Sequence, residues 1–570
     1  MDLLRLSKVA KKEEKAELVL KNCQIVNVFD RSIEHNDIAI EDGYIVGIGN
    51  YNGKREIDIK NQFVAPGLID GHVHIESSML TPSEFSKIIM PKGTTTVIAD
   101  PHEIANVIGI EGIKYMVESS KKTPLDVNIM IPSCVPATVF ESNGAIISSK
   151  EIKKLKTTEG ILGLGEVMDY VSVINGEEGM IKKLKTMKDF IIDGHAPNVT
   201  NEELNAYLIS GIKTDHECTT VLEMQEKLKR GMYIHLREGS ATRNVEALSK
   251  GVTKDNSHRL MFCTDDKHPE DIRKEGHINF NINKAIENKV DPLIAIQMAT
   301  INTATCYNLK QQGAIAPGYF ADLIVFKTLD KIEPNLVFKN GVLVAKDNVH
   351  LFETTKYVNS DVLKTVKFNF KDINLDLKLK SNKVKVIKLI EQNVITKQVI
   401  KEVEIENGIY VNNEEDDILK IAVIERHHYT KNIGLGLLTG YGLKNGAIGM
   451  SIAHDSHNLI VVGDNDEDMI EVIKELKRIE GGIVVASKGK VIDYLQLEIA
   501  GLMTNQDIEV VESKLKNLNQ AARKLGVKKE VDDPFLSLAF MSLPVIPDLK
   551  LTDKGLFDVT KFELVEIEAD

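Results

Sequence analysis

The chain has 570 residues, of which 43% are hydrophobic and 27% are charged, and its formal net charge is -13. This acidic balance gives no general affinity for nucleic-acid backbones or anionic membranes, and the ordinary composition allows a sizeable core. The N-terminal segment is charged throughout, no apolar run reaches the ~18 residues of a membrane span, and the five cysteines are scattered singly. We therefore expect a soluble, cytoplasmic protein whose partners include neither a nucleic-acid polymer nor a membrane.

Short β patterns occur on both sides of a long central region. The first flank has a turn signal at Asp42-Gly43, and the second has one at Asn340-Gly341. Asp-Gly and Asn-Gly pairs favour two-residue hairpins. We expect the two flanks to form one small β-sandwich module beside the central region.

In the central region, apolar β-like runs alternate with helical patterns, as a parallel α/β fold requires. Eight such runs are found at Gly67–His74, Thr94–Asp100, Val127–Pro132, Ile161–Val167, Phe190–His195, Gly211–His216, Met232–Leu236 and Arg259–Asp265. Eight strands close a (β/α)8 TIM-like barrel, and a span of roughly 250 residues is the usual size of that fold. We therefore predict an α/β chain with such a barrel at its centre.

The pattern changes after about residue 360. Strand-like alternation in "ILKIAVIERHH" is followed by helical spacing with charged outer faces in "DMIEVIKELKRI". These patterns predict a C-terminal α+β domain. The expected parts in chain order are the start of the β module, the barrel, the return of the β module and the C-terminal domain, at residues 1–65, 66–311, 312–358 and 359–570.

Each of the eight runs is apolar until its end, where polar residues stand. His72 and His74 end the first run, and both can reach one point because residues i and i+2 of a strand share a face. The ends of the other runs carry Asp100, His102, Glu166, His195, His216, Arg237, Glu238, Asp265 and Asp266. A single residue of this kind is usually structural. A whole set at the face where barrel enzymes keep their active sites predicts a functional site.

Four histidines and two carboxylates in one barrel mouth indicate a metal centre. Buried without partners, these groups would cost several kcal/mol, and divalent cations satisfy them together. The set exceeds what one tetrahedral zinc needs, so two ions that share a bridging carboxylate fit better. Nitrogen and oxygen ligands without thiolate suit Mn2+, Fe2+ and Zn2+ about equally. Because such a centre brings the pKa of a bound water towards neutrality, the set predicts a hydrolase.

The ordered motifs resemble those of a known family. They are "GLIDGHVHIESSML", "ADPHEIANV", "GEVMD", "DGHAP", "TDHE", "CTDD" and the distal "MSIAHDSHNLIVVG". Together they resemble the amidohydrolase superfamily and, within it, the bacterial adenine deaminases, over nearly the whole chain. The resemblance implies hydrolysis of adenine to hypoxanthine and ammonia in purine salvage. We expect two divalent cations, Mn2+ first with Fe2+ and Zn2+ as alternatives, and a homo-oligomer that is a dimer or larger.

The resemblance also implies individual roles. The implied metal ligands, with Glu166 as the bridge, are His72, His74, Glu166, His195, His216 and Asp265. We expect Asp265 to shuttle the proton of the attacking water, because a carboxylate at the mouth can accept it and return it. The next residue, Asp266, is expected to point away from the site.

Two residues are candidates for the acid that protonates N1 of the purine. They are Glu103 in "DPHEIAN" and Glu238 in "LREGS". The alternative for each is a structural ion pair with a nearby arginine, such as Arg237 or Arg243.

Other interpretations stay open at this point. A different hydrolase with the same metals, such as an N-acetylglucosamine-6-phosphate deacetylase or a cyclic-amide hydrolase, would also suit the barrel. A non-catalytic scaffold is the alternative from another class, although all six ligand positions here carry competent residues. The C-terminal residues His454, Asp455 and His457 have three interpretations: a separate metal site, a lid element near the mouth, or interdomain packing.

Overall fold

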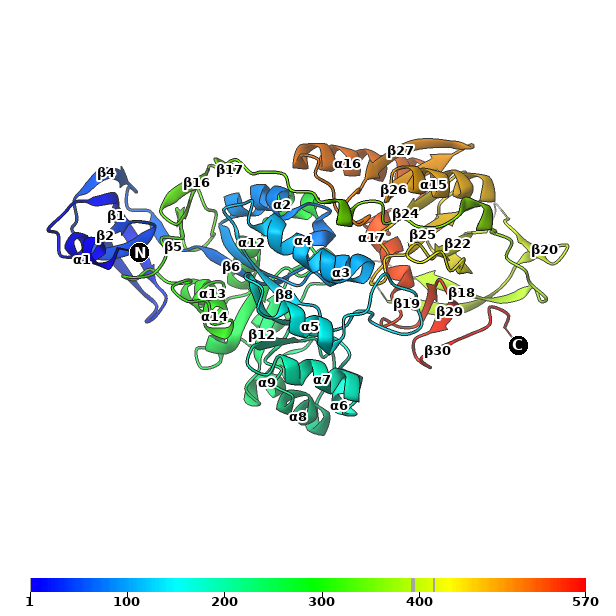
Figure 1. Ribbon diagram of the computed structural model, residues 1–570, viewed down its shortest axis with the longest axis horizontal. Coiled ribbons are helices and arrows are strands. Elements are labelled where there is room, and N and C mark those ends of the chain that lie inside the picture. Colours follow the sequence, from blue (N-terminus) through cyan, green and yellow to red (C-terminus); the bar gives the residue numbers. More distant parts are fainter. Residues whose placement is uncertain (1, 391–394, 414–415, 570) are drawn as a thin grey trace.

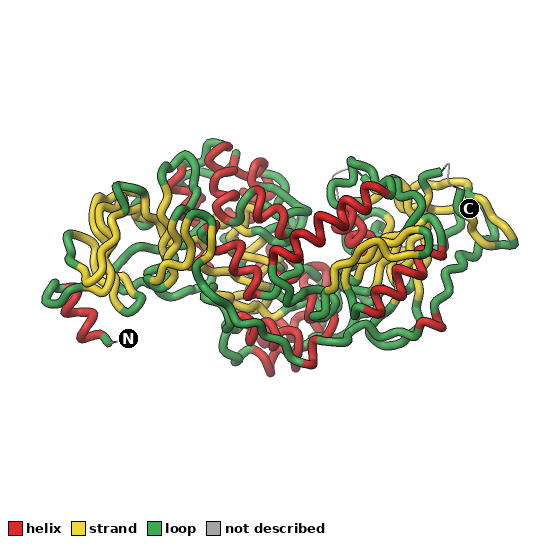
Figure 2. The backbone as a smooth tube through the Cα atoms, turned by 90° about the horizontal axis from the view of Figure 1, so that it is seen from above, coloured by secondary structure: helices red, strands yellow, loops and turns green. Residues whose placement is uncertain are grey.

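The computed structural model describes residues 2–390, 395–413 and 416–569. The molecule is elongated, and the two ends of the chain lie at opposite ends of its long axis (Figure 1). A β-rich module occupies one end, helices and strands are mixed in the middle, and a second region rich in strands occupies the other end (Figure 2). None of the described helices is both long enough and apolar enough to cross a membrane.

The two flanks of the barrel share one sheet of nine strands. The strands are β1 (Ala16–Asn27), β2 (Ser32–Glu41), β3 (Tyr44–Gly49), β4 (Gly53–Asp58), β5 (Phe63–Pro66), β14 (Leu323–Phe326), β15 (Leu336–Lys339), β16 (Val342–Lys346) and β17 (Val349–His350). Strand β14 of the second flank pairs with β5 of the first, and helix α1 (Leu3–Ala10) packs against β1 to β3. Asp42, Gly43, Asn340 and Gly341 all have positive φ, as the predicted hairpins require.

All eight predicted central runs form strands. They are β6 (Leu68–Val73), β7 (Thr94–Ala99), β8 (Asp126–Ile131), β9 (Ile161–Val167), β10 (Ile191–Gly194), β11 (Thr214–Asp215), β12 (Tyr233–Arg237) and β13 (Leu260–Cys263). They pair in parallel and in chain order, as five strands from β6 to β10 and three from β11 to β13. Backbone bonds join the two sets at both seams: Lys213 N–H donates to Ile192 O and Asp265 N–H to His72 O, each at 2.9 Å. The strands therefore form the predicted ring, and their carboxyl ends meet at one mouth.

Helices surround this ring (Figure 1). They are α2 (Pro82–Ile89), α3 (His102–Ile108), α4 (Ile110–Ser120), α5 (Ser149–Leu155), α6 (Tyr170–Ile174), α7 (Glu178–Thr186), α8 (Asn201–Ile209), α9 (Val221–Lys229), α10 (Val245–Ser249), α11 (Pro269–Lys274), α12 (Ile278–Glu287), α13 (Pro292–Met298) and α14 (Ile301–Cys306). Strands β6 and β7 are buried along their whole length, because helices cover the ring outside and side chains fill it inside. This double burial explains why the runs are apolar except at their ends.

The C-terminal region combines strands and helices, as predicted. Its strands are β18 (Lys383–Leu389), β19 (Thr396–Glu402), β20 (Glu404–Glu406), β21 (Ile409–Val411), β22 (Ile418–Ile424), β23 (Ile433–Thr439), β24 (Ala447–Met450), β25 (Leu459–Gly463), β26 (Gly482–Ser487), β27 (Lys490–Gln496), β28 (Leu549–Thr552), β29 (Gly555–Asp558) and β30 (Glu563–Leu564). Its helices are α15 (Asp466–Arg478), α16 (Ile508–Lys524) and α17 (Pro534–Ala539). Eight of the strands form one sheet, in the order β19-β18-β23-β22-β25-β24-β26-β27. The loop between β24 and β25 carries His454 and His457.

Candidate metal centre and active site

The paired histidines of the first strand face one point. His74 Nδ1 lies 2.8 Å from the carbonyl oxygen of Asp100. Because a carbonyl only accepts, Nδ1 carries the ring proton and Nε2 keeps its lone pair. His72 Nε2 lies 3.1 Å from this Nε2, and both rings are buried. Asp265 Oδ1 lies 3.1 Å from His74 Nε2, so three groups that can donate an electron pair converge there.

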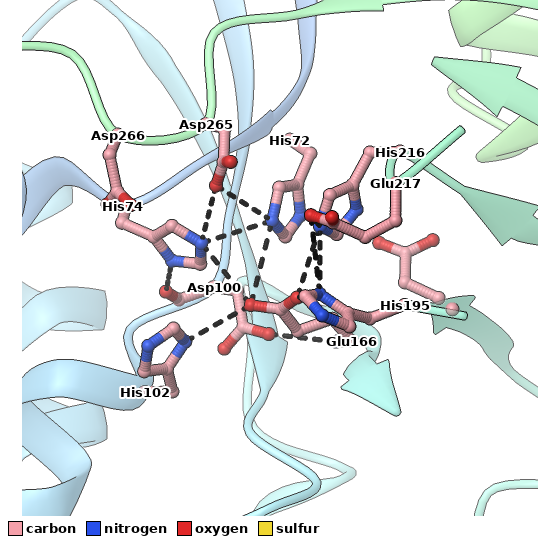
Figure 3. A network of polar contacts seen from close by, with 12 residues as sticks. His72, His74, Asp100, His102, Glu166, His195, His216, Glu217, Asp265 and Asp266 are labelled. Carbon is pink, nitrogen blue, oxygen red and sulfur yellow. Dashed lines mark hydrogen bonds and ion pairs between the residues drawn. The ribbon is translucent and has the colours of Figure 1, made fainter. Parts of the chain in front are cut away.

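A second pair of histidines stands at the ends of β10 and β11. His195 Nδ1 lies 3.2 Å from His216 Nε2. The Glu166 carboxylate from β9 lies between the two pairs (Figure 3). Its Oε1 is 3.3 Å from His74 Nε2, and its Oε2 is 2.8 Å from His195 Nδ1 and 3.2 Å from His216 Nε2. One carboxylate oxygen therefore serves each histidine pair.

This set of donor atoms fits divalent cations. Glu166 forms one group with His72 and His74 and another with His195 and His216, and within each group the ligand atoms lie within 4.8 Å of one another. Burial alone would raise the pKa of Glu166, but hydrogen bonds from the surrounding histidines hold it well below the ordinary value. Glu166 is therefore an anion that needs positive charge beside it, either from protons on the histidines or from cations held by their ring nitrogens.

Arg237 orients Asp265. Its Nη1 lies 2.5 Å from Asp265 Oδ2 and 2.5 Å from Glu217 Oε1. Burial would raise the pKa of Asp265, but the charge of Arg237 holds it well below the ordinary value. Because Oδ2 is bound to the guanidinium, Oδ1 is the oxygen that faces the histidines. Glu217 is not among the residues predicted from the sequence, and its position directly after His216 in "TDHE" is the only sequence signal for it.

The prediction that Asp266 points away from the site is wrong. The Asp266 carboxylate belongs to a group with His74 and Asp265 whose ligand atoms lie within 4.8 Å of one another. The prediction assumed that the alternation of a strand continues through Asp265. Strand β13 ends at Cys263, and Asp265 has φ +60°, so the backbone turns before Asp266. Both aspartates therefore face the mouth (Figure 3).

The two acid candidates have different surroundings. Glu103 is buried, its Oε1 accepts from Ser77 Oγ at 2.9 Å, and its Oε2 has no hydrogen-bond partner among the described residues. Glu238 Oε1 accepts from Val245 N at 3.1 Å, and its Oε2 lies 3.9 Å from Arg243 Nη1. Glu103 therefore has a free oxygen near the metal-ligand set, whereas Glu238 has the arginine contact that a structural role implies.

A buried lysine holds two of the ligand-bearing turns together. Lys227 Nζ donates to Asp215 Oδ2 at 2.9 Å and to Ala196 O at 2.6 Å. Asp215 Oδ1 accepts from Ala196 N at 2.8 Å. Because Asp215 precedes His216 and Ala196 follows His195, this network sets the distance between the two histidines. Burial would raise the pKa of Asp215, but Lys227 lowers it to about 2, so the aspartate stays ionised.

We expect Asp215→Asn to weaken metal binding without emptying the site. The amide keeps an acceptor for Ala196 N but loses the ion pair with Lys227. Groups that support a metal ligand are typically worth about 10- to 100-fold in metal affinity. The measurement is metal titration of the apoprotein against a competing chelator. The control is Asp322→Asn, which removes a buried aspartate whose Oδ2 lies 2.6 Å from Lys339 Nζ in the β module. Equal affinities for the two variants would contradict the role of the network.

A cavity of about 1050 Å³ lies between the barrel and the C-terminal region. Its lining includes Met79, His268, Asp533 and Phe540, and it runs along α16 and α17. His268 Nδ1 lies 3.2 Å from Asp533 Oδ2, which joins the two parts of the chain beside the cavity. The Phe540 ring also stacks on His454, with 4.7 Å between ring centroids. The cavity therefore reaches the side of the barrel mouth.

The ring of parallel strands and the donor set at its mouth are those of an amidohydrolase. Residues 63–344 match the model of the Amidohydrolase family, and residues 393–563 match the Adenine deaminase C-terminal domain. A relative named adenine deaminase, from Clostridium acetobutylicum, is 49% identical over 97% of this chain and 98% of its own length. Adenine deaminase 2 of Carboxydothermus hydrogenoformans is 47% identical over 99% of each chain. The chain belongs to the adenine deaminase family.

Proposed function

We propose that this protein hydrolyses adenine to hypoxanthine and ammonia. The observation that supports this most is the position of Glu166, whose two oxygens each contact one histidine pair, in a chain of the adenine deaminase family. In the reaction the oxygen of water bonds to C6 of adenine, and the bond between C6 and the amino nitrogen breaks. Ammonia leaves after a proton has reached the amino group.

Two divalent cations would complete the site. His72, His74 and Asp265 would hold one ion, His195 and His216 the other, and Glu166 both. Cations held in this way lower the pKa of water and polarise the group under attack. Ligands that are all nitrogen or oxygen suit Mn2+, Fe2+ and Zn2+ about equally. We put Mn2+ first on the family resemblance, with Fe2+ and Zn2+ as alternatives.

Asp265 accepts the proton of the attacking water. Its Oδ1 faces the histidines, and its Oδ2 is held by Arg237. A base must stand within hydrogen-bond reach of the proton that it takes, and a fixed carboxylate at the mouth meets this condition. The same oxygen can then return the proton to the amino group that leaves.

Glu103 supplies the proton to N1 of the ring. Burial raises the pKa of Glu103 well above the ordinary value for a glutamate, and the neighbouring Asp266 raises it further. A carboxyl group that stays protonated near neutral pH can donate to a ring nitrogen. Its unpartnered Oε2 is the atom available for this contact. We keep Glu238 as the second candidate, although its contact with Arg243 favours a structural role.

The test is a substrate screen of the purified, metal-analysed protein that measures ammonia from adenine, the ring-opened acid from a cyclic amide and acetate from the acetylated amino sugar. Apoprotein is reconstituted with Mn2+, Fe2+ or Zn2+ and given adenine, a cyclic amide or N-acetylglucosamine 6-phosphate. Turnover of adenine, with ammonia released in the same amount as hypoxanthine, supports the proposal. Turnover of an amide or acetylated amino sugar without turnover of adenine would assign the site to one of the alternative hydrolases.

We expect free adenine to be used better than adenosine. This expectation rests on the relatives, which are named for adenine and not for its nucleoside. Because one or a few extra atoms in a fitted pocket change kcat/KM by about 10-fold or more, we expect at least about that ratio. The measurement is kcat/KM for both compounds with the same metal. Comparable values would shift the assignment to a nucleoside deaminase.

The remaining parts of the proposal concern the protein in the cell. We place it in the cytoplasm, in purine salvage, as a homo-oligomer that is a dimer or larger. Its relatives over the whole length of the chain are named for the same reaction. Sedimentation of the metal-loaded protein measures the oligomeric state, and a species of one chain would contradict that part.

A further inference from the structure

The C-terminal region is attached to the barrel mouth by hydrogen bonds to backbone carbonyl groups of the barrel loops. Thr504 N–H donates to Met79 O at 3.0 Å, directly after the segment that carries Ser77. Asn458 Nδ2 donates to Ser142 O at 2.8 Å, in the loop after β8. These bonds place the loop between β24 and β25 over the mouth. The barrel and the C-terminal region meet at this place, although no strand of one belongs to a sheet of the other.

His454 on this loop reaches the proposed acid. Its Nδ1 lies 3.4 Å from Glu103 Oε1, and both side chains are buried. The direction of the His454 ring is set from within the C-terminal region. Its face stacks on Phe540 with an interplanar angle of 26°, and its backbone N–H donates to Ala539 O at 3.1 Å. The two atoms make no hydrogen bond in this structure, and contacts of this kind at catalytic groups are often poorly aligned until substrate binds and tightens them.

Glu103 needs the contact with His454 because its other partner, Ser77, also contacts Asp266. Ser77 Oγ lies 2.9 Å from Glu103 Oε1 and 2.5 Å from Asp266 Oδ1. A serine hydroxyl has one proton, so it can donate to only one of the two carboxyl groups at a time. Whenever Ser77 donates to Asp266, His454 is the remaining candidate donor for Glu103 Oε1 among the contacts of the described residues.

A separate metal site at this place fits the ring nitrogens less well. Ligand atoms of Glu103, His454 and His457 do lie within 4.8 Å of one another. However, His457 Nδ1 accepts from Ala453 N at 3.3 Å, so the ring proton is on Nε2. A nitrogen that carries a proton has no lone pair for a metal. The cluster therefore suits hydrogen bonding between side chains rather than a further ion.

We propose that His454 is a positioning residue that holds Glu103 with its free oxygen towards the substrate ring, so that the C-terminal region completes the active site. The inference rests on the proposed function through the role of Glu103. It assigns a task in the reaction to the C-terminal region. His454 itself need not touch the substrate.

The experiment compares two replacements of His454. His454→Phe keeps the stacking on Phe540 and removes the N–H group, whereas His454→Asn loses the ring but places an amide N–H near the position of Nδ1. We expect the phenylalanine variant to lower kcat for adenine by about tenfold or more, with little change in KM or metal content, because a hydrogen bond to a catalytic acid is lost. The asparagine variant should recover part of that loss.

A double-mutant cycle separates this role from a structural one. In a Glu103→Gln background, His454→Phe should lower kcat no further, because residues that act through one another are not additive. The control is Asp553→Ala, which removes another bond between the same parts of the chain, from Ser142 N to Asp553 Oδ1 at 2.8 Å. We expect it to keep the kcat of the unmodified protein.

The possible outcomes distinguish a failure of the proposed function from a failure of the role of His454. If the unmodified protein releases no ammonia from adenine, the proposed function and the role of His454 fall together. If it does, and His454→Phe keeps full kcat or its loss adds in full to that of Glu103→Gln, only the role of His454 is overturned. An equal loss of kcat in Asp553→Ala would also overturn the role of His454. Any loosening of the contact between the barrel and the C-terminal region would then be enough to lower kcat.

Discussion

Replacing Asp265 with asparagine is expected to lower kcat for adenine by about 10²- to 10⁴-fold, the usual contribution of a general base, while most of the metal is retained. The amide keeps an oxygen at the position that lies 3.1 Å from His74 Nε2. It cannot take the proton of the attacking water. Arg237 keeps its ion pair with Glu217, so the variant loses only the ion pair between Arg237 and residue 265. The measurement is kcat beside metal content in the same preparation.

Asp266→Asn is the comparison for this variant. Asp266 also faces the mouth, but its observed bond is the one that it accepts from Ser77, and an asparagine oxygen can accept the same bond. We therefore expect a much smaller loss of kcat than for Asp265→Asn. An Asp265→Asn enzyme with near-normal turnover at full metal occupancy would show that the proton shuttle lies elsewhere, with Glu103 as the first residue to examine.

Replacing Glu166 with glutamine should remove metal as well as activity. The carboxylate contacts His74 through one oxygen and His195 and His216 through the other. An amide offers only one acceptor atom, so one histidine pair loses its shared ligand. Supporting residues of metal ligands are already worth about 10- to 100-fold in metal affinity or activity, so we expect a loss of at least about 100-fold for the bridge itself.

The measurement for Glu166→Gln is the number of metal equivalents per chain, together with kcat as metal is added back. For the unmodified protein we expect activity to rise until two equivalents are bound. Saturation at one equivalent would contradict a centre of two ions. Unchanged occupancy in the glutamine variant would contradict the bridging role and leave Glu166 as a structural residue.

The strand pattern could be predicted from the sequence because it depends on local chemistry. The eight runs became eight strands because strands covered on both faces favour apolar residues, although the run Gly211–His216 kept only Thr214–Asp215 as a strand. The polar residues where those runs stop came together for the same reason. The carboxyl ends of parallel strands share one edge, so His74, His195 and His216 meet although long stretches of chain separate them.

Side chains beyond the last strand residue could not be predicted in this way. Asp266 faces the mouth because the backbone at Asp265 has positive φ, and no alternation pattern extends past the end of a strand. Glu217 lies two residues after the end of β11 and contacts Arg237 at the end of β12, the neighbouring strand. The orientation of such residues depends on the path of a loop, which distant contacts determine.

The sequence by itself determined which residue types stand at the mouth and that they suit a metal-dependent hydrolase, because periodicity and residue chemistry are local properties. The tertiary structure alone decided that Glu166 lies between the two histidine pairs, and that His454 reaches Glu103 across more than half of the chain. Such contacts join segments that are far apart in the sequence, and the sequence pattern of one segment does not indicate the other. They exist because the C-terminal region packs against the barrel, and burial of that interface sets the direction of each side chain within it.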